Sequence, residues 1–139
     1  MTDRPRLYPT TTGVSLGDLG SSVVPLARNI AATRLPILRP PEPVFATWAV
    51  TEACNLACAH CDMNRPLPDE LDHAQRTEMA RRLAQSGVWG VSLIGGEPLL
   101  VEGIFEYARI LKDGGKRVFI GTSGDRLARY VDRVLDSGI

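Results

Sequence analysis

The sequence predicts an α/β protein built on three parallel strands, each followed by a helix. Three short stretches rich in branched and aromatic residues, at residues 44–50, 91–94 and 116–121, alternate with longer stretches whose apolar residues recur at helical spacing. Such alternation is typical of parallel sheets with right-handed helical crossovers. A loop of unusual composition follows each strand. In a parallel array these loops share the carboxyl edge of the sheet, so we expect them to converge there.

The bulk composition of the 139-residue chain fits one globular domain. The chain is 44% hydrophobic and 23% charged, which is not the composition of a disordered protein. Its 16 basic and 16 acidic side chains balance, which leaves no electrostatic footprint for nucleic acid. No apolar run approaches the roughly 18 residues of a membrane span, and no secretory signal layout is present. We therefore expect neither a nucleic-acid nor a membrane partner.

Residues 1–41 are predicted to form an N-terminal extension, and residues 42–139 the core domain. Prolines and turn residues punctuate the extension. One short helix is predicted over residues 25–34, where Leu26 and Ile30 place apolar side chains on one face. We interpret this helix as a cover for the bottom or side of the core domain.

The first strand of the core, residues 44–50, leads directly into a loop that holds all three cysteines. A coil at residues 64–68 follows. The next helix is predicted to begin after Asp72, a good N-cap residue, with Gln75 three residues on to complete a capping box. Gly87 stands where a C-terminal cap glycine belongs. The apolar face of this helix is expected to comprise Met79, Ala80, Leu83 and Ala84.

Two further strand–helix units complete the predicted core. The second strand, residues 91–94, runs into a Gly-Gly-Glu-Pro sequence and then a helix from about Val101, which Gly114 and Gly115 end. Ile104, Ala108 and Leu111 form its apolar stripe.

The third strand, residues 116–121, runs into a Thr-Ser-Gly sequence and a last helix over about residues 125–136. Gly138 is the expected cap of this helix. Its inward face is expected to hold Leu127, Val131, Val134 and Leu135.

The three cysteines form the motif Cys54-x-x-x-Cys58-x-x-Cys61. Their odd number and close spacing disfavour disulfides. Three thiolates on one short loop are a ligand set for a soft metal or an iron–sulfur cluster. An iron–sulfur cube normally takes four protein thiolates, so three would leave one iron open to another ligand.

Two alternatives use the same cysteines differently. They are three structural cysteines clustered by chance, or ligands of a zinc ion with His60 as the fourth ligand. Adjacent residues rarely reach the same ion, and His60 adjoins Cys61. Zinc would therefore need His73 or an external ligand.

The cysteine motif resembles the signature of the radical S-adenosylmethionine (SAM) enzymes. Residues 51–61, TEACNLACAHC, resemble the SPASM-type subgroup, which often carries a C-terminal cluster-binding extension and modifies peptides or small metabolites. The resemblance implies that Cys54, Cys58 and Cys61 hold a [4Fe-4S] cluster whose open iron binds SAM. One electron then cleaves SAM to methionine and a 5′-deoxyadenosyl radical, which abstracts hydrogen from a substrate. His60 occupies a position where the family often has an aromatic residue near the adenine.

The residues Gly95, Gly96, Glu97 and Pro98 form the second motif. Two glycines after a strand let the backbone approach a ligand closely, whereas the simpler interpretation is a tight turn with a solvated glutamate. The sequence resembles the family's Gly-Gly-Glu-Pro motif, whose backbone edge contacts the amino group of SAM. We therefore expect Gly96→Val to weaken SAM binding and to leave the cluster in place.

The Thr122-Ser123-Gly124 sequence is the third motif. Without the resemblance it is a strand-to-helix turn in which a hydroxyl caps the helix. Similar family members have Thr-Asn-Gly here, near the SAM carboxylate or the substrate, so Ser123 is expected to contact the cofactor. Asp62 and His60 are either surface groups or, each by itself, a general acid or base beside the cluster.

The resemblance covers residues 43–139 and only the first half of the family domain, which is usually a partial (β/α)6 barrel. The fold expected here is therefore a (β/α)3 portion with an N-terminal extension, truncated after the third unit. We interpret the chain as a fragment, a truncated product or one half of a split protein, and expect it to self-associate on its own. The alternatives are a non-catalytic zinc or iron–sulfur module and an inactive remnant that keeps the cluster loop.

The resemblance also implies partners. An external electron donor, flavodoxin- or ferredoxin-like, would reduce the cluster, and the substrate would be a peptide or small metabolite. A partner chain could supply the missing half-barrel. Clustered free cysteines suit a reducing compartment, so we predict a cytoplasmic location.

Overall fold

The computed structural model describes residues 23–24, 27, 43–65 and 67–139. Apart from Ala27, the helix predicted over residues 25–34 lies outside this described part. The predicted boundary between extension and core, at residues 41 and 42, also lies outside the described part and stays a prediction.

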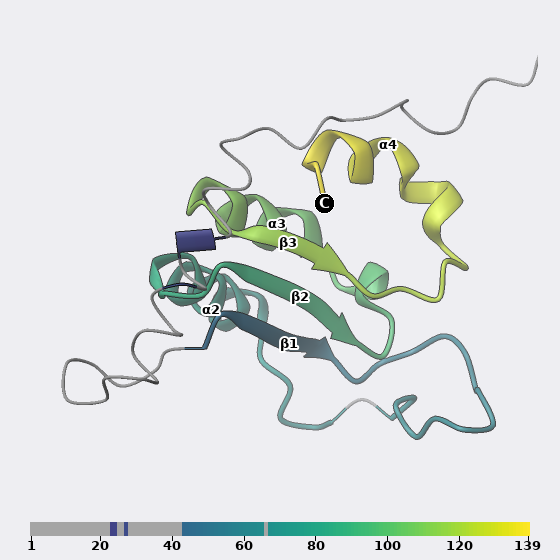
Figure 1. The fold of residues 1–139 in the computed structure, drawn as a ribbon. Helices are drawn as coiled ribbons and strands as arrows, with labels where there is room; N and C mark the ends of the chain where they lie inside the picture. Colours follow the sequence, from purple (N-terminus) through teal and green to yellow (C-terminus); the bar gives the residue numbers. More distant parts are fainter. Residues whose placement is uncertain (1–22, 25–26, 28–42, 66) are drawn as a thin grey trace, which may run out of the picture.

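Three parallel strands form one sheet in the order β1-β2-β3, and their arrows point the same way in Figure 1. A helix follows each strand, and a 3-10 turn precedes the second of these helices. The predicted α/β class with a parallel three-stranded sheet is therefore confirmed. The elements are β1 (Phe45–Thr51), α2 (His73–Gln85), β2 (Gly90–Gly95), η1 (Pro98–Leu100), α3 (Ile104–Asp113), β3 (Arg117–Ile120) and α4 (Leu127–Ser137).

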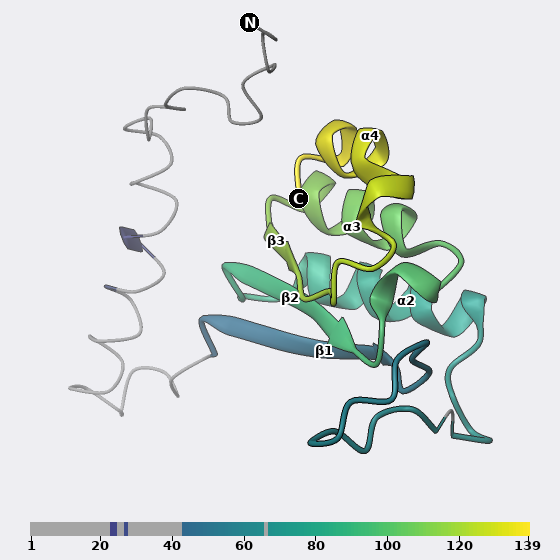
Figure 2. The ribbon, with the colours of Figure 1, turned by 90° about the vertical axis from the view of Figure 1, so that its right-hand side faces the viewer.

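Helices α2, α3 and α4 lie on one side of the sheet (Figure 2). Side chains alternate between the two faces of a strand, and on the helical side Trp48, Val50 and Leu93 are buried. On the other face Phe45 and Phe119 remain 43% and 45% exposed, with ring centroids 5.6 Å apart. The described part of the chain thus has one covered and one open sheet face.

Helix α2 begins as predicted and ends differently. The Asp72 side chain accepts from the backbone amide of Gln75 at 2.8 Å, and the Gln75 side chain accepts from the backbone amide of Asp72 at 2.9 Å. These two bonds complete the capping box. At the other end Ser86, not Gly87, is the cap residue, and its amide donates to the Leu83 carbonyl. Gly87 does not adopt positive φ, so the predicted glycine cap is wrong.

Helix α3 supplies much of the core. Tyr107, Ala108 and Leu111 are fully buried, and the Tyr107 ring packs 5.8 Å from that of Trp48. The helix begins later than the predicted Val101, because η1 and Gly103, with φ of 87°, come first.

The predicted inward face of α4 is confirmed at Val134 and wrong at the other three positions. Leu127, Val131 and Leu135 are 38%, 44% and 71% exposed, whereas Tyr130 and Val134 pack on the core. The Tyr130 ring packs at a tilt against that of Phe105 of α3, with centroids 5.8 Å apart. The helix therefore has a second apolar stripe that no described residue covers. Gly138 caps it with φ of 61°, as expected.

No helix of the described part of the chain combines the length and apolar character that a membrane span requires.

Candidate functional site

Three loops leave the sheet at its carboxyl edge, on the side toward which the arrows point in Figure 1. We name them the cysteine loop (residues 52–71), the Gly-Gly-Glu-Pro loop (residues 95–98) and the Thr-Ser-Gly loop (residues 121–125). Hydrogen bonds between these loops, described below, confirm the convergence predicted from the parallel topology.

The Gly-Gly-Glu-Pro loop lies against the start of the cysteine loop. The Gly96 amide donates to the Thr51 carbonyl at 2.8 Å, and the Glu97 amide donates to the Ala53 carbonyl at 2.9 Å. A Cβ on Gly95 would collide with the Thr51 carbonyl, and one on Gly96 with the Ala53 carbonyl. Glycine is therefore required at both positions because the loop packs closely on the backbone of residues 51–53, just before Cys54.

This packing corrects the expected outcome of Gly96→Val. The substituted side chain would displace Ala53, the residue before Cys54, so the cysteine loop would shift as well. The contact of this loop with SAM stays a prediction.

Glu97 is a buried carboxylate with every oxygen engaged, not the solvated residue of the simpler interpretation. Its side chain is fully buried. It accepts from the Leu99 amide at 3.0 Å, the Thr122 hydroxyl at 2.8 Å, and the Ser123 amide and hydroxyl at 2.9 and 2.7 Å. Burial raises the pKa of Glu97, but the hydrogen bonds that it accepts outweigh burial and hold the pKa below its ordinary value. Glu97 therefore joins the Gly-Gly-Glu-Pro loop to the Thr-Ser-Gly loop.

Ser123 has a limited capacity for a further ligand. Its hydroxyl proton goes to Glu97, and its oxygen accepts weakly from the Asp125 amide at 3.4 Å. A hydroxyl carries one donor proton, so Ser123 can accept from an ammonium or amide group but cannot donate to a carboxylate. This favours an amino group over a carboxylate as its partner in any bound ligand.

A second link joins the cysteine loop to the Thr-Ser-Gly loop. The Asn55 side-chain amide donates to the Asp125 carboxylate at 2.7 Å, on the exposed rim of the site. Asn55 follows Cys54 directly, so this contact and the Ala53 contact flank that cysteine.

The three cysteines lie on one loop as free thiols, with Cys54 half-buried and Cys58 and Cys61 exposed. The Leu56 amide donates to Cys54 Sγ at 3.4 Å, and the Cys61 amide donates to the Cys58 carbonyl at 3.1 Å. Among the described residues, no three His, Cys, Asp or Glu side chains are grouped closely enough to hold a single metal ion.

The donor set fits an iron–sulfur cluster better than a zinc ion. Thiolates of a cluster bind different iron atoms, so their sulfurs need not converge on one point as zinc ligands must. The amide of Leu56 that points at Cys54 Sγ is also the kind of donor that tunes cluster thiolates.

The two histidines are placed differently. His60 is exposed on the cysteine loop, as is Asp62. His73, at the start of α2, lies 2.8 Å from the Tyr107 hydroxyl and 3.6 Å from the Glu106 carboxylate. These contacts tie His73 to α3, which does not favour its role as a zinc ligand.

Glu70 and Arg76 hold the base of the cysteine loop, and neither belongs to a recognisable sequence motif. Glu70 accepts from the Glu52 amide at 2.7 Å and from the Thr51 hydroxyl at 2.8 Å, and it pairs with Arg76 at 2.8 Å. Burial raises the pKa of Glu70, but these hydrogen bonds and the Arg76 charge outweigh it, so the pKa is lowered. An acid in a proline-flanked loop gives no sequence signal of such contacts.

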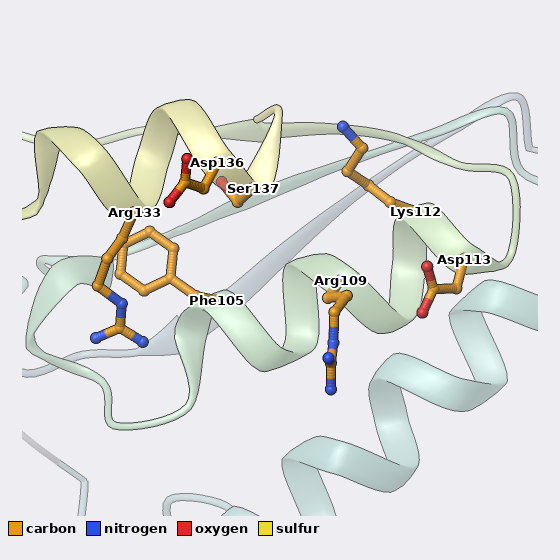
Figure 3. Close-up of a pocket in the computed structure, with 7 residues that line it drawn as sticks. All are labelled: Phe105, Arg109, Lys112, Asp113, Arg133, Asp136 and Ser137. Carbon is orange, nitrogen blue, oxygen red and sulfur yellow. The ribbon is translucent and has the colours of Figure 1, made fainter.

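A hollow of about 490 Å³ lies between α3 and α4. Its charged side chains diverge: Arg109 and Lys112 point to opposite sides of α3, and Arg133 lies over the Phe105 ring at 4.3 Å (Figure 3). Lys112 donates to the Gly138 carbonyl at 2.6 Å. No convergent set of groups for a ligand is present in this hollow.

Comparisons with known proteins match the region that contains all three loops. Residues 48–139 match the model of the Radical SAM superfamily. The chain is 38% identical over 100 residues to a GTP 3′,8-cyclase of Chlorobaculum tepidum, an alignment that covers 68% of this chain and 30% of that protein.

Two further relatives carry other names. An AdoMet-dependent heme synthase of Methanosarcina barkeri is 32% identical over 101 residues, 70% of this chain and 29% of its own length. The sporulation killing factor maturation protein SkfB of Bacillus subtilis is 38% identical over 66 residues, 46% of this chain and 16% of its own length. The alignments thus span less than a third of each of these relatives. Together with the family match, they show that the chain belongs to the radical SAM superfamily.

Proposed function

We propose that this chain is the cluster-bearing part of a radical SAM enzyme, in which Cys54, Cys58 and Cys61 ligate a [4Fe-4S] cluster. The observation that carries the proposal is the position of the three free thiols. They lie on a single loop at the carboxyl edge of a parallel sheet, within the region that matches the family. The Gly-Gly-Glu-Pro loop is hydrogen-bonded to the base of that loop, which supports a shared site.

When bound, the cluster supplies the one-electron reduction that starts radical chemistry on SAM. The residues of this chain hold and orient the reactants. The backbone of Gly95, Gly96, Glu97 and Pro98 would bind SAM beside the cysteine loop. Ser123 would accept a hydrogen bond from its amino group, and His60 would border the adenine from the exposed side of the loop.

The names of the relatives indicate different substrates, so the substrate class proposed here is broad: a peptide or a small metabolite. An external flavodoxin- or ferredoxin-like protein would deliver the electron. Because the alignments span less than a third of each relative, a further segment or a partner chain would complete the substrate site. The free thiols support a reducing, cytoplasmic setting.

The test is anaerobic reconstitution of the chain with iron and sulfide, followed by measurement of iron, sulfide and thiolate-to-iron absorption. We expect about four irons per chain and loss of the cluster in Cys58→Ala, because three ligands leave no spare. Asn64→Ala, an exposed change on the same loop, is the matched control and should retain the cluster.

A second measurement separates an enzyme from a binding module. With SAM and dithionite, formation of 5′-deoxyadenosine above the level of Cys58→Ala would support the enzymatic proposal. Full iron content in Cys58→Ala would overturn the ligand assignment. A bound cluster with no SAM cleavage, even after a completing segment is supplied, would favour the non-catalytic alternative.

A further inference from the structure

The cysteine loop is closed at its base by one carboxylate. Glu70 lies 18 residues after Glu52 in the chain, yet its Oε1 accepts from the Glu52 amide at 2.7 Å. Both of its oxygens also accept from the Thr51 hydroxyl, at 3.1 and 2.8 Å. The two ends of the segment that carries all three cysteines therefore meet at this side chain.

Arg76 fixes the carboxylate from the helical side. One guanidinium nitrogen pairs with Glu70 at 2.8 Å, and Nε donates to the Val50 carbonyl at 2.9 Å. The Arg76 and Glu70 side chains are only 15% and 21% exposed. Arg76 belongs to the first turn of α2, so the pair connects the end of β1, the end of the cysteine loop and the start of α2.

The same contacts reach the residue before the first cysteine. The Thr51 hydroxyl, which donates to Glu70, also accepts from the Ala53 amide at 3.0 Å. The Ala53 carbonyl in turn accepts from the Glu97 amide at 2.9 Å. Both backbone polar groups of Ala53 are thus fixed, one through Thr51 to Glu70 and the other by the Gly-Gly-Glu-Pro loop.

We propose that Glu70 and Arg76 form a clamp that closes the cysteine loop and positions Cys54 as a ligand. Both are positioning residues, because neither reaches a thiol. The inference about the cluster depends on the proposed function, whereas closure of the loop does not. Hydrogen bonds to an ionised carboxylate are shorter and stronger than neutral ones, and closure reduces the conformational freedom of the loop before any ligand binds.

The first test uses the cluster-free full chain and amide hydrogen exchange of the segment around Glu52. In Glu70→Gln, which keeps the size of the side chain and removes its charge, we expect protection of the Glu52 and Ala53 amides to fall by about tenfold or more. The control is Glu78→Gln on α2, whose exposed carboxylate pairs with Arg82 at 2.9 Å. Protection in Glu70→Gln equal to that of the wild type would overturn the clamp.

The second test concerns the cluster. After reconstitution, we expect Glu70→Gln and Arg76→Lys to lose iron to a chelator about tenfold faster than the wild type, with altered electron paramagnetic resonance of the reduced cluster. Glu78→Gln and Arg82→Lys should match the wild type. Lower amide protection with unchanged iron retention and spectrum would overturn the positioning of Cys54. A wild-type chain that takes up no cluster would overturn the proposed function and that positioning role, whereas the exchange result would still decide whether the clamp exists.

Discussion

At the scale of single residues, Glu97 makes the stability of the site depend on pH. Its carboxylate accepts all of its hydrogen bonds in the ionised form. Folding therefore lowers the pKa of Glu97 below its ordinary value of 4.5. A group with a depressed folded pKa contributes stability above its unfolded pKa, and this contribution is lost as the pH falls through the folded pKa. The links between the Gly-Gly-Glu-Pro and Thr-Ser-Gly loops should therefore weaken in acid, below about pH 4.5.

We expect Glu97→Gln to lower the free energy of unfolding by about 1–3 kcal/mol at neutral pH, because an amide N–H₂ would face buried donors. Urea denaturation of both proteins at neutral pH and at about pH 3 checks this. The difference between wild type and variant should shrink in acid. A constant difference across that range would show that ionisation of Glu97 is not what stabilises the loops.

Gly96 gives a second prediction at this scale. Because a Cβ there would collide with the Ala53 carbonyl, Gly96→Ala should displace the start of the cysteine loop and strongly reduce iron uptake on reconstitution. Gly121→Ala is the control, since its Cβ would meet the Ile94 side chain at 3.3 Å and no backbone atom. Normal iron uptake by Gly96→Ala, with SAM affinity alone reduced, would instead support the expectation from the sequence that this loop contacts SAM and does not affect the cluster.

At the scale of elements, α4 contributes to the core through one of its two apolar stripes. Tyr130 and Val134 pack on α3 and the core, whereas Leu135 is 71% exposed. We expect Val134→Ala to cost about 1 kcal/mol or more of unfolding free energy and Leu135→Ala to cost less than about 0.5 kcal/mol. Urea denaturation measures both. Equal costs would mean that the Leu135 stripe is covered in solution.

The sequence predicted the helices and strands better than the contacts between them. The reason is that the signals for an element are local in sequence, whereas these contacts join residues far apart in the chain. Asp72 and Gln75 form their capping box within one turn, so the start of α2 followed from local chemistry. Helical periodicity placed apolar residues on α4 but not the side that meets α3. The contacts of Glu97 and Glu70 join residues 26 and 18 positions apart, and nothing in their neighbourhoods signals such pairing.

At the scale of the whole molecule, open surfaces of two kinds favour self-association. β1 and β3 are the outer strands of the described sheet, and unpaired strand edges are templates for pairing with another chain. Phe45 and Phe119 lie exposed on the open sheet face, and Leu135 on α4. Exposed apolar groups of this kind commonly mark interfaces.

We therefore expect the isolated 139-residue chain to form oligomers or aggregates in size-exclusion chromatography with light scattering. Replacement of Phe119 by Lys, which puts a charge on the edge strand β3, should increase the monomer fraction. A monodisperse wild-type monomer that forms 5′-deoxyadenosine through many turnovers would show that the chain needs no further segment.

The unequal exposure of the three thiols sets an order for filling and losing the site. In the proposed site, iron from solution would reach the exposed Cys58 and Cys61 before the half-buried Cys54. Cys54 would then be the last of the three thiols to bind iron during cluster assembly. Oxidants reach accessible thiolates first, so Cys58 and Cys61 would be the first of the three to be oxidised. The proposed cluster would therefore be assembled and oxidised from the same exposed side of the cysteine loop.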